Sequence, residues 1–333
     1  MIGTNSASNL ILPELIDFRA YMADTDAKAK VRNASVFNGS LKDRLRQKIN
    51  EKKVYLPWEK TMQNFDFRPG EMTLWAGQNG HGKSAVTAQV MLSLIGQGET
   101  VGAANFEAKP LTVLQRQARM FAGMNPFSPE FQSGRGLDAI DALYDEFFGW
   151  VDKRLWIYDQ EGTTDPQLLA GMVKYCATAK GCTHVVIDNL AKVVAGEDDY
   201  NGQKAFVDQC TAMARDLGIH IHLVHHLRKP PKETDLPDKH DIKGSGAIAD
   251  QSDNLILVYR NKKKEIDVRL KGSMSQIRDE PDQILFVRKQ RNYEGVADGE
   301  PQINLWFHKD SQQYIAHAED VPQFFINYPH RPT

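Results

Sequence analysis

The stretch Gly77-Gln78-Asn79-Gly80-His81-Gly82-Lys83-Ser84 matches the phosphate-binding pattern G-x-x-x-x-G-K-[ST] at every fixed position. The apolar run at 71–76 just before it has the composition of a buried strand. The residues that follow, Ala85 to Ile95, have the composition of a helix. Strand, glycine loop and helix are the context that this motif requires. We therefore expect Gly77 to Ala85 to hold the phosphates of a nucleotide.

The spacing of the loop explains how it would work. Gly80 and Gly82 permit backbone angles that a side chain would forbid, so the loop can wrap a phosphate chain with its N–H groups. The helix that follows points its positive end at the same anion. We expect Lys83 to reach the β and γ phosphates and the Ser84 hydroxyl to bind Mg²⁺. The expected cofactors are ATP, or another nucleoside or deoxynucleoside triphosphate, and Mg²⁺. The alternative is a glycine-rich turn that binds no nucleotide.

The bulk composition is that of a globular protein. The chain has 333 residues, 41% of them apolar and 25% charged, enough for one large α/β domain with extensions or for two small domains. The net charge of −2 gives no overall basic field, so any nucleic-acid binding must come from local loops. Cys176, Cys182 and Cys210 form no C-x-x-C pair, which disfavours a zinc module. With no apolar run of membrane-spanning length and no signal peptide, we expect no membrane contact and a cytoplasmic location, in a bacterium or a phage-infected host.

Strand and helix signals alternate from Phe67 onward. The expected strands cover 100–106, 154–158, 184–188, 219–225, 253–259, 283–289 and 303–307; the expected helices cover 111–124, 137–149, 165–179 and 202–217. This order predicts an α/β fold with a mainly parallel sheet and helices on both faces. Ligands of such sheets bind at the carboxyl ends of the strands. The run Lys262-Lys263-Lys264 is interpreted as a solvated turn.

The two ends of the chain differ from this middle part. We expect a short helical extension over residues 1–55, the α/β domain over 56–316 and a tail over 317–333. Leu41, Leu45 and Ile49 form a narrow apolar stripe on a very polar helix. That stripe would pack either on the core of its own chain or on a neighbouring subunit. The tail contains three prolines and is expected to be a loosely held extension.

Two acidic residues follow expected strands. Asp188 ends the β-branched run at 184–188, where its carboxylate would hold Mg²⁺ beside Ser84. Glu107 follows the strand that comes next after the phosphate loop and its helix. There it would face the γ-phosphate and orient or deprotonate the attacking water. The alternative for Glu107 is a solvated glutamate at the edge of the sheet.

The order of these motifs resembles a known family. After the phosphate loop, Phe106-Glu107 and Asp188 come three further segments: Val224-His225-His226-Leu227-Arg228-Lys229-Pro230, Asp241-Ile242-Lys243-Gly244-Ser245-Gly246-Ala247 and Lys289-Gln290-Arg291-Asn292. This order is similar to the RecA-like motor domain of hexameric replicative DNA helicases, which include DnaB, the helicase half of phage primase-helicases and mitochondrial Twinkle. Leu56-Pro57-Trp58 ahead of Arg68-Pro69-Gly70-Glu71 looks most like the Twinkle branch. The resemblance covers residues 54–310 and implies a RecA-like P-loop NTPase core.

The resemblance implies further site residues. His226 stands where the family has a polar sensor of the γ-phosphate; alternatively it is a core histidine beside His225. Arg291 looks like the arginine finger that reaches into the site of the next subunit, accompanied by Lys289, and such a guanidinium neutralises charge on the transferring phosphoryl group. The alternative for Arg291 is a surface arginine. Arg260 and Phe307 match positions where the family clamps the base of the nucleotide.

DNA would contact two loops, at 191–203 and 228–246. In the second loop, Lys243-Gly244-Ser245-Gly246 can present backbone N–H groups and a cation to successive phosphates, and Arg228, Lys229 and Lys232 add positive charge. Each of these three basic residues could instead be only solvated.

The expected protein is a ring-forming, ATP-driven motor that moves 5′ to 3′ on single-stranded DNA and unwinds forked duplex DNA, as the family does. It would form a homo-hexamer, with a separate primase, polymerase or loader as candidate partners. The 55 residues ahead of the motor are too few for a primase or a helical collar, so we expect no priming activity. The alternatives are a recombinase-like ATPase that forms filaments on DNA without unwinding it, and a non-catalytic DNA-binding scaffold subunit.

Overall fold

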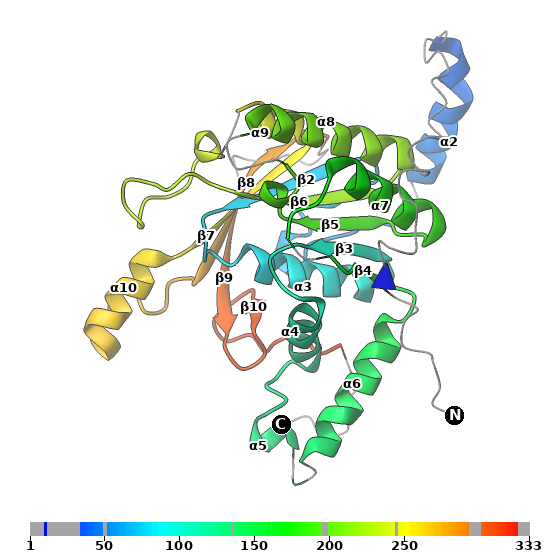
Figure 1. Ribbon diagram of the computed structural model, residues 1–333. Coiled ribbons are helices and arrows are strands. Elements are labelled where there is room, and N and C mark those ends of the chain that lie inside the picture. Colours follow the sequence, from blue (N-terminus) through cyan, green and yellow to red (C-terminus); the bar gives the residue numbers. More distant parts are fainter. Residues whose placement is uncertain are drawn as a thin grey trace.

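The computed structural model describes residues 10–11, 34–48, 52–132, 134, 136–160, 162–194, 199–243, 246–292 and 301–325. Within these residues one sheet runs through the molecule, with strand order β1-β4-β3-β5-β6-β2-β7-β8-β9-β10 (Figure 1). The strands are β1 (Leu10–Ile11), β2 (Met72–Gly77), β3 (Val101–Asn105), β4 (Leu155–Tyr158), β5 (His184–Asp188), β6 (His220–His226), β7 (Asn254–Arg260), β8 (Gln283–Gln290), β9 (Gln302–His308) and β10 (Gln313–Ile315).

The sheet has a parallel part and an antiparallel part. Strands β1 to β7 pair in parallel, whereas β8, β9 and β10 extend the sheet as antiparallel strands. Every residue of β2 and of β5 is buried, as expected for parallel strands that are covered on both faces. The prediction of an α/β fold with a mainly parallel sheet is confirmed.

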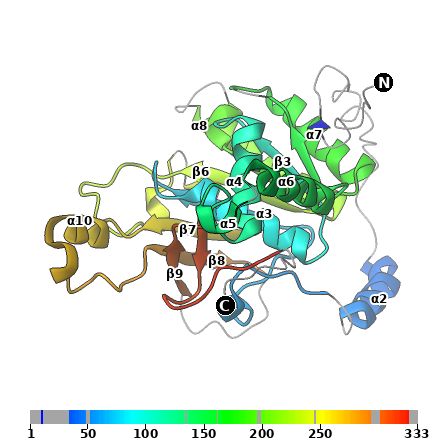
Figure 2. The same ribbon diagram turned by 90° about the horizontal axis from the view of Figure 1, so that it is seen from below.

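Helices cover both faces of this sheet (Figures 1 and 2). One hydrophobic core lies under α3, α4 and α6, and a second lies under α7 and α8. The α-helices are α2 (Asn38–Lys48), α3 (Lys83–Gly96), α4 (Pro110–Ala122), α5 (Pro129–Gln132), α6 (Leu137–Val151), α7 (Pro166–Ala179), α8 (Tyr200–Leu217), α9 (Ala247–Gln251) and α10 (Lys262–Lys271). Short 3₁₀ turns are η2 (Ala34–Phe37), η3 (Glu59–Thr61), η4 (Leu190–Lys192), η5 (Lys239–Asp241) and η6 (Gly272–Met274).

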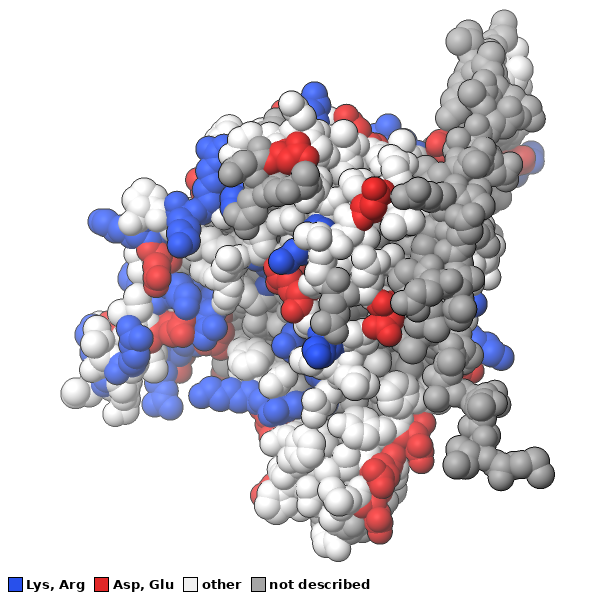
Figure 3. Space-filling model, viewed as in Figure 1, with Lys and Arg blue, Asp and Glu red and all other residues white. Residues whose placement is uncertain are grey.

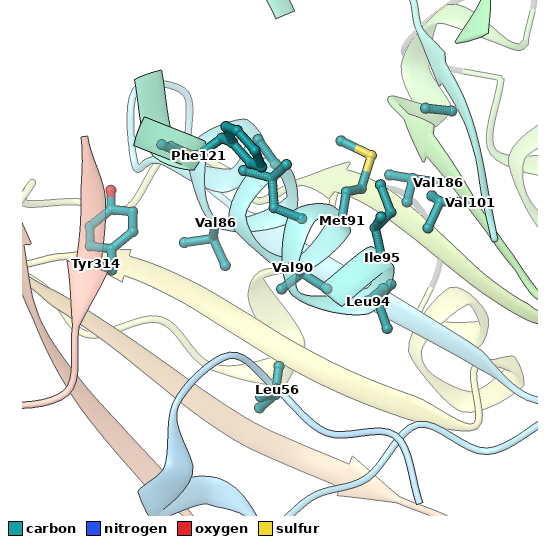
Figure 4. Close-up of a cluster of buried hydrophobic side chains, with 14 of the residues drawn as sticks. Leu56, Val86, Val90, Met91, Leu94, Ile95, Val101, Phe121, Val186 and Tyr314 are labelled. Atoms are coloured by element: carbon teal, nitrogen blue, oxygen red, sulfur yellow. The ribbon is translucent and has the colours of Figure 1, made fainter. Parts of the chain in front are cut away.

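Helix α3 is the most deeply buried helix around the phosphate loop. Val86, Val90 and Leu94 repeat every four residues along it, and each is 1% exposed or less. Figure 4 shows them among side chains from α4, from the segment before β2 and from β10. Full burial of each such side chain contributes roughly 1.5–3 kcal/mol. The helix that carries Lys83 and Ser84 is therefore firmly fixed to the sheet.

One expected turn is a helix. Lys262, Lys263 and Lys264 form the first turn of α10, not a solvated turn. The side chain of Asn261 caps this helix by accepting a hydrogen bond from Lys264 N (3.1 Å), and Lys262 Nζ pairs with Glu265 (2.9 Å). An asparagine directly before a charged run is a helix-start signal, and it outweighs the expectation of a turn.

Leu41 and Leu45 of the expected stripe on α2 do not pack on the core formed by the described residues. Leu41 and Leu45 are 59% and 58% exposed, and α2 stands apart from the sheet in both ribbon views (Figures 1 and 2). Ile49, the third member of the expected stripe, lies outside the described residues. The expected alternatives are packing on the core of the same chain or on a neighbouring subunit, and the first is not seen for Leu41 and Leu45.

The tail is held more firmly than expected as far as Phe325. The Phe325 ring stacks on Phe121, with 6.2 Å between ring centroids and 9° between ring planes. The Gln313 side chain donates to Gln323 O (2.7 Å) and accepts from Gln323 N (2.9 Å). Aromatic contacts this far apart in sequence are invisible to a local pattern.

Among the described helices, none is both long and apolar enough to cross a membrane.

Candidate active site

The phosphate loop has the strained geometry that its glycines permit. Gly80 and Gly82 adopt positive φ angles of 77° and 84°, in the left-handed region. A Cβ atom at Gly82 would lie 2.6 Å from the Tyr314 hydroxyl and 3.0 Å from Gln283 Oε1. The loop at 78–82 can therefore form only without a side chain at this position, and it delivers the start of α3 to the carboxyl edge of β2.

Lys83 lies at the centre of the loop. Its Nζ donates to Gly77 O (2.8 Å) and to Gln78 O (3.0 Å), and lies 3.1 Å from His226 Nδ1. Burial lowers the pKa of Lys83 to about 8, although Asp188 and Glu107 pull it upward. Lys83 is 7% exposed, and its ammonium group is bonded only to neutral atoms, so it can exchange these carbonyls for phosphate oxygens.

Sheet register explains why Glu107 and His226 meet here. His226 is paired with Gly77 across β6 and β2, and Asn105 is paired with Asp188 across β3 and β5. The Asn105 side chain then accepts from Glu107 N (3.0 Å) and fixes the turn after β3. The ends of β3, β5 and β6 therefore lie at the same carboxyl edge of the sheet as the phosphate loop.

A polar chain links these residues above the loop. Asn189 Nδ2 donates to Glu107 Oε1 and lies 2.9 Å from His226 Nε2, and that nitrogen is 3.6 Å from Glu107 Oε1. The contact with His226 is the main cause that lowers the pKa of Glu107, with Asn189 and Lys83 contributing. Glu107 is therefore held as a carboxylate, 44% of its side chain exposed, where a water molecule can reach it.

Asp188 and Ser84 have the donors that Mg²⁺ requires. Asp188 is 4% exposed, and its Oδ1 atom has no hydrogen-bond partner among the described residues. Burial raises the pKa of Asp188, and a hydrogen bond with Ser84 opposes that rise. A buried carboxylate oxygen beside a hydroxyl fits a hard divalent cation, which would supply the missing partner and favour the charged form. These residues fit the predicted metal site.

A hollow of about 560 Å³ lies over the phosphate loop. Its lining includes Glu107, His226, Lys83, Phe307 and Tyr314. Such a space is large enough for a nucleotide. Phe307 lines this hollow, and its role in clamping the base stays a prediction.

Arg260 lies beside the loop. Its backbone N–H donates to His81 Nδ1 (3.3 Å), and its guanidinium pairs with Glu265 (2.9 Å). Burial lowers the pKa of His81 to about 4, so this histidine is a neutral support of the loop.

Lys289 and Arg291 do not reach the site of their own chain. Lys289 lies near the end of β8, and Arg291 follows that strand directly. This part of the chain pairs with the start of β7, whereas the phosphate loop follows the carboxyl end of β2, at the other end of the strands. Lys289 Nζ donates to Ala249 O and Asp250 O (2.9 and 2.7 Å), and Arg291 Nη1 lies 3.3 Å from Asp253 Oδ1. The Arg291 side chain is 41% exposed. Any role in hydrolysis must therefore be played in another subunit.

The expected DNA loop is joined to the strand that ends in His226. Lys243 N donates to His226 O (3.1 Å), His225 Nε2 lies 2.6 Å from Lys243 O, and Leu227 pairs with Ile242. Arg228, Lys229 and Lys232 are exposed, as is Gly246. Gly244 and Ser245 lie outside the described residues, as do residues 195–198 of the other expected DNA loop. Figure 3 shows Lys and Arg side chains gathered over α10 and the loop that joins β6 to α9.

Sequence reasoning missed two residues that complete the site. Asn189 links Glu107 to His226, and its only sequence signal is its place directly after Asp188. Tyr314 closes the floor under Gly82, and its backbone carbonyl accepts from Trp58 Nε1 (2.7 Å). No local pattern could have joined Tyr314 to a loop more than 200 residues away.

Comparisons with known proteins identify the family and the fold of the chain. The family described as an AAA domain matches residues 59–232, more than half of the chain. A curated relative named DNA helicase/primase, from Enterobacteria phage T3, is 26% identical over 247 residues, which cover 68% of this chain. They cover 43% of that relative, so the chain spans less than half of its length.

Two solved structures share the fold. One is described as an ATPase domain; it superposes with a TM-score of 0.66 at 15% identity, covering 85% of this chain and 99% of that domain. A DnaB-like replicative helicase, solved to show its interactions with primase, superposes with a TM-score of 0.63 at 15% identity, covering 89% and 70%. The resemblance inferred from the motifs is confirmed. The chain belongs to the AAA-domain family and has the RecA-like ATPase fold of DnaB-like replicative helicases.

Proposed function

We propose that this chain is the motor of a ring-shaped replicative DNA helicase that hydrolyses ATP and moves 5′ to 3′ on single-stranded DNA. One observation carries the proposal. The polar chain from Lys83 through His226 and Asn189 to Glu107 is complete within one subunit, whereas Arg291 lies at the opposite edge of the same sheet. A site that needs an arginine would have to be completed by a neighbouring copy of the chain.

In this proposal Lys83 holds the β and γ phosphates, and Asp188 and Ser84 hold Mg²⁺, which neutralises charge on the phosphates when bound. Glu107 orients and deprotonates the attacking water, because its carboxylate is charged and accessible. His226 and Asn189 hold Glu107 in place and contact the γ-phosphate. Arg291 of one subunit stabilises the charge that develops in the site of the next.

The same contacts suggest how hydrolysis moves DNA. Because Lys243 N donates a backbone hydrogen bond to His226 O, a shift of His226 when the γ-phosphate leaves would shift the start of the DNA loop. Lys243 would then carry a phosphate of the strand with it, without reading its sequence.

Ring assembly has a candidate device in α2. Its exposed Leu41 and Leu45 would dock on a neighbouring subunit, since they do not pack on the described core of their own chain. From the resemblance we also propose that the ring has six subunits. A separate primase, polymerase or loader is a proposed partner on the same ground. The T3 relative, named as a helicase and primase, supports the replicative role.

The test is nucleotide-dependent unwinding of a forked duplex that carries only a 5′ tail or only a 3′ tail. We expect unwinding from the 5′ tail alone, and a loss of roughly 10²-fold or more in Glu107→Gln, as for removal of a general base. The matched control is Glu319→Gln, the same change at an exposed glutamate. ATP hydrolysis stimulated by single strands without unwinding of either fork would instead favour a recombinase-like ATPase, and tight nucleotide binding without hydrolysis would favour a scaffold subunit.

A further inference from the structure

Arg116 is a half-buried arginine at the nucleotide hollow that none of the sequence motifs includes. It lies on the second turn of α4 and lines the same hollow as Lys83, Phe307 and Gln312. Its guanidinium makes no hydrogen bond or ion pair with any of the described residues.

Such a group is unusual, because a guanidinium has five N–H donors and is costly to bury without partners. Arg119, one turn further along α4, shows the ordinary arrangement: it donates to Asp310 O (2.6 Å) and Lys309 O (3.0 Å). Arg119 therefore anchors the turn between β9 and β10, whereas the donors of Arg116 remain available to an anion.

Arg116 lines the hollow together with Phe307 and Tyr314 of the antiparallel strands. It also borders a smaller hollow that is lined by Ser84, Thr87 and Asp188. Burial raises the pKa of Tyr314 to about 12, and the positive charges of Arg260 and Arg116 oppose this rise. The charges that act on the pKa of Glu107, in contrast, come from His226 and Lys83.

Gln312 lines the hollow together with Arg116. Its φ angle of +59° lies in the left-handed region, which a residue with a side chain rarely occupies. Strain of this kind persists where the surrounding structure requires it, often at ligand sites. Here the strained residue is Gln312, whose half-buried side chain lines the hollow together with Arg116 and Phe307.

We propose that Arg116 binds the nucleoside end of the nucleotide held by its own subunit, at the α-phosphate and sugar. In a phosphate loop the β-phosphate sits inside the loop and the γ-phosphate lies toward Lys83 and Glu107, so the nucleoside leaves toward Arg116 and Phe307. The inference rests on the proposed function in one respect only, namely that the loop binds a nucleotide. It gives each site one arginine from its own chain, in addition to Arg291 from the neighbour.

The test is calorimetric titration of the full chain with ADP and with a slowly hydrolysed ATP analogue, neither carrying a label that would occupy the nucleoside end. Arg116→Ala is compared with Arg116→Lys and with Lys109→Ala, which removes the same charge from an exposed position at the start of the same helix. Loss of a charge-assisted hydrogen bond should weaken binding roughly tenfold or more. We expect the same factor for the diphosphate and the triphosphate in Arg116→Ala, a smaller loss in Arg116→Lys and none in Lys109→Ala.

Two outcomes would overturn the inference. A loss confined to the triphosphate analogue would place the guanidinium at the γ-phosphate, and unchanged affinity for both ligands would show that it binds neither. In each case wild-type binding would leave the proposed function intact. If the wild-type chain bound no nucleotide at all, the proposed function would fail as well, and thermal unfolding of each variant separates lost binding from lost folding.

Discussion

Lowering the pH should destabilise this protein before most of its carboxylates titrate, because histidines lie buried inside the sheet and three of them form a cluster. His184, His220 and His222 come from β5 and β6 and are each 3% exposed or less. His184 Nδ1 lies 3.1 Å from His222 Nε2, and His220 Nε2 lies 2.8 Å from Thr73 Oγ1. Burial lowers the pKa of His220 to about 4 and lowers the pKa values of His184 and His222 well below their ordinary value.

The sign follows from proton binding. An unfolded histidine has a pKa of about 6.5. Between that value and the lowered value in the fold, the unfolded chain binds a proton that the folded chain refuses. Stability is therefore fully present above about pH 6.5 and falls as the pH drops toward 4. Full linkage costs about 1.4 kcal/mol per pH unit, so His220, with a pKa of about 4 in the fold, alone costs roughly 2 kcal/mol between pH 7 and pH 5. The lowered pKa values of His184 and His222 add to this loss, which is already a large fraction of the stability of an ordinary domain.

The assay is urea unfolding followed by tryptophan fluorescence at pH 7, 6 and 5. We expect the midpoint to fall steeply over this range, and to fall less steeply in His184→Gln, which removes one titrating group. His240→Gln, at a histidine whose side chain is 82% exposed, should behave as the wild type does. The lowered pKa values of Glu71 and Glu107 change the stability only below about pH 4.5, the ordinary pKa of a glutamate, and therefore outside this pH range. A midpoint that stays constant from pH 7 to pH 5 would show that the buried histidines do not control stability.

Three further predictions concern the phosphate loop and its neighbours. Because burial lowers the pKa of Lys83 to about 8 and a bound triphosphate must raise it, nucleotide affinity should fall by up to about tenfold per pH unit above pH 8. Calorimetry in buffers of different ionisation enthalpy should detect the proton taken up, and Lys83→Ala should abolish it. Gly82→Ala should lose about 1–2 kcal/mol of stability and most nucleotide binding, because the residue has φ +84° and its Cβ would meet Tyr314. Gly149→Ala within α6, where a Cβ meets nothing within 4 Å, should be neutral or stabilising in the same thermal unfolding experiment. Asn189→Ala should lower kcat at least tenfold with little change in nucleotide affinity, since it removes the group that links Glu107 to His226. Weakened nucleotide binding with unchanged kcat would instead show that Asn189 supports the loop.

The parts of the fold that sequence reasoning found are those with a local signature. The apolar runs that become β2 and β5, and the glycine loop between β2 and α3, carry their pattern within ten residues. General rules for parallel sheets then place the carboxyl ends of the strands at one edge, which brings Glu107, Asp188 and His226 together, but the order of the strands was not predicted.

The parts that were missed depend on contacts between distant segments. Tyr314 meets Gly82, and Phe325 meets Phe121, across roughly 200 residues of chain. The three core histidines look polar in sequence and are made neutral only by the sheet around them. In sequence Arg116 is one more charge on an amphipathic helix, and only its unpaired position at the hollow distinguishes it from Arg119.

In the proposed ring, each active site is shared between two copies of the chain. The sharing is tested by mixing Lys83→Ala subunits with Arg291→Ala subunits and measuring ATP hydrolysis stimulated by single-stranded DNA. Arg215→Ala is the matched control, because Arg215 pairs with the same Asp253 carboxylate that Arg291 does. It should leave activity nearly unchanged.

Each of the two variants alone should be inactive. A mixed ring, however, joins the intact loop of an Arg291→Ala subunit to the intact arginine of a Lys83→Ala neighbour. Random mixing in equal amounts would complete about a quarter of the interfaces, so we expect recovery toward that fraction of wild-type activity. An Arg291→Ala variant that is fully active alone, or a mixture that recovers nothing, would contradict the shared site.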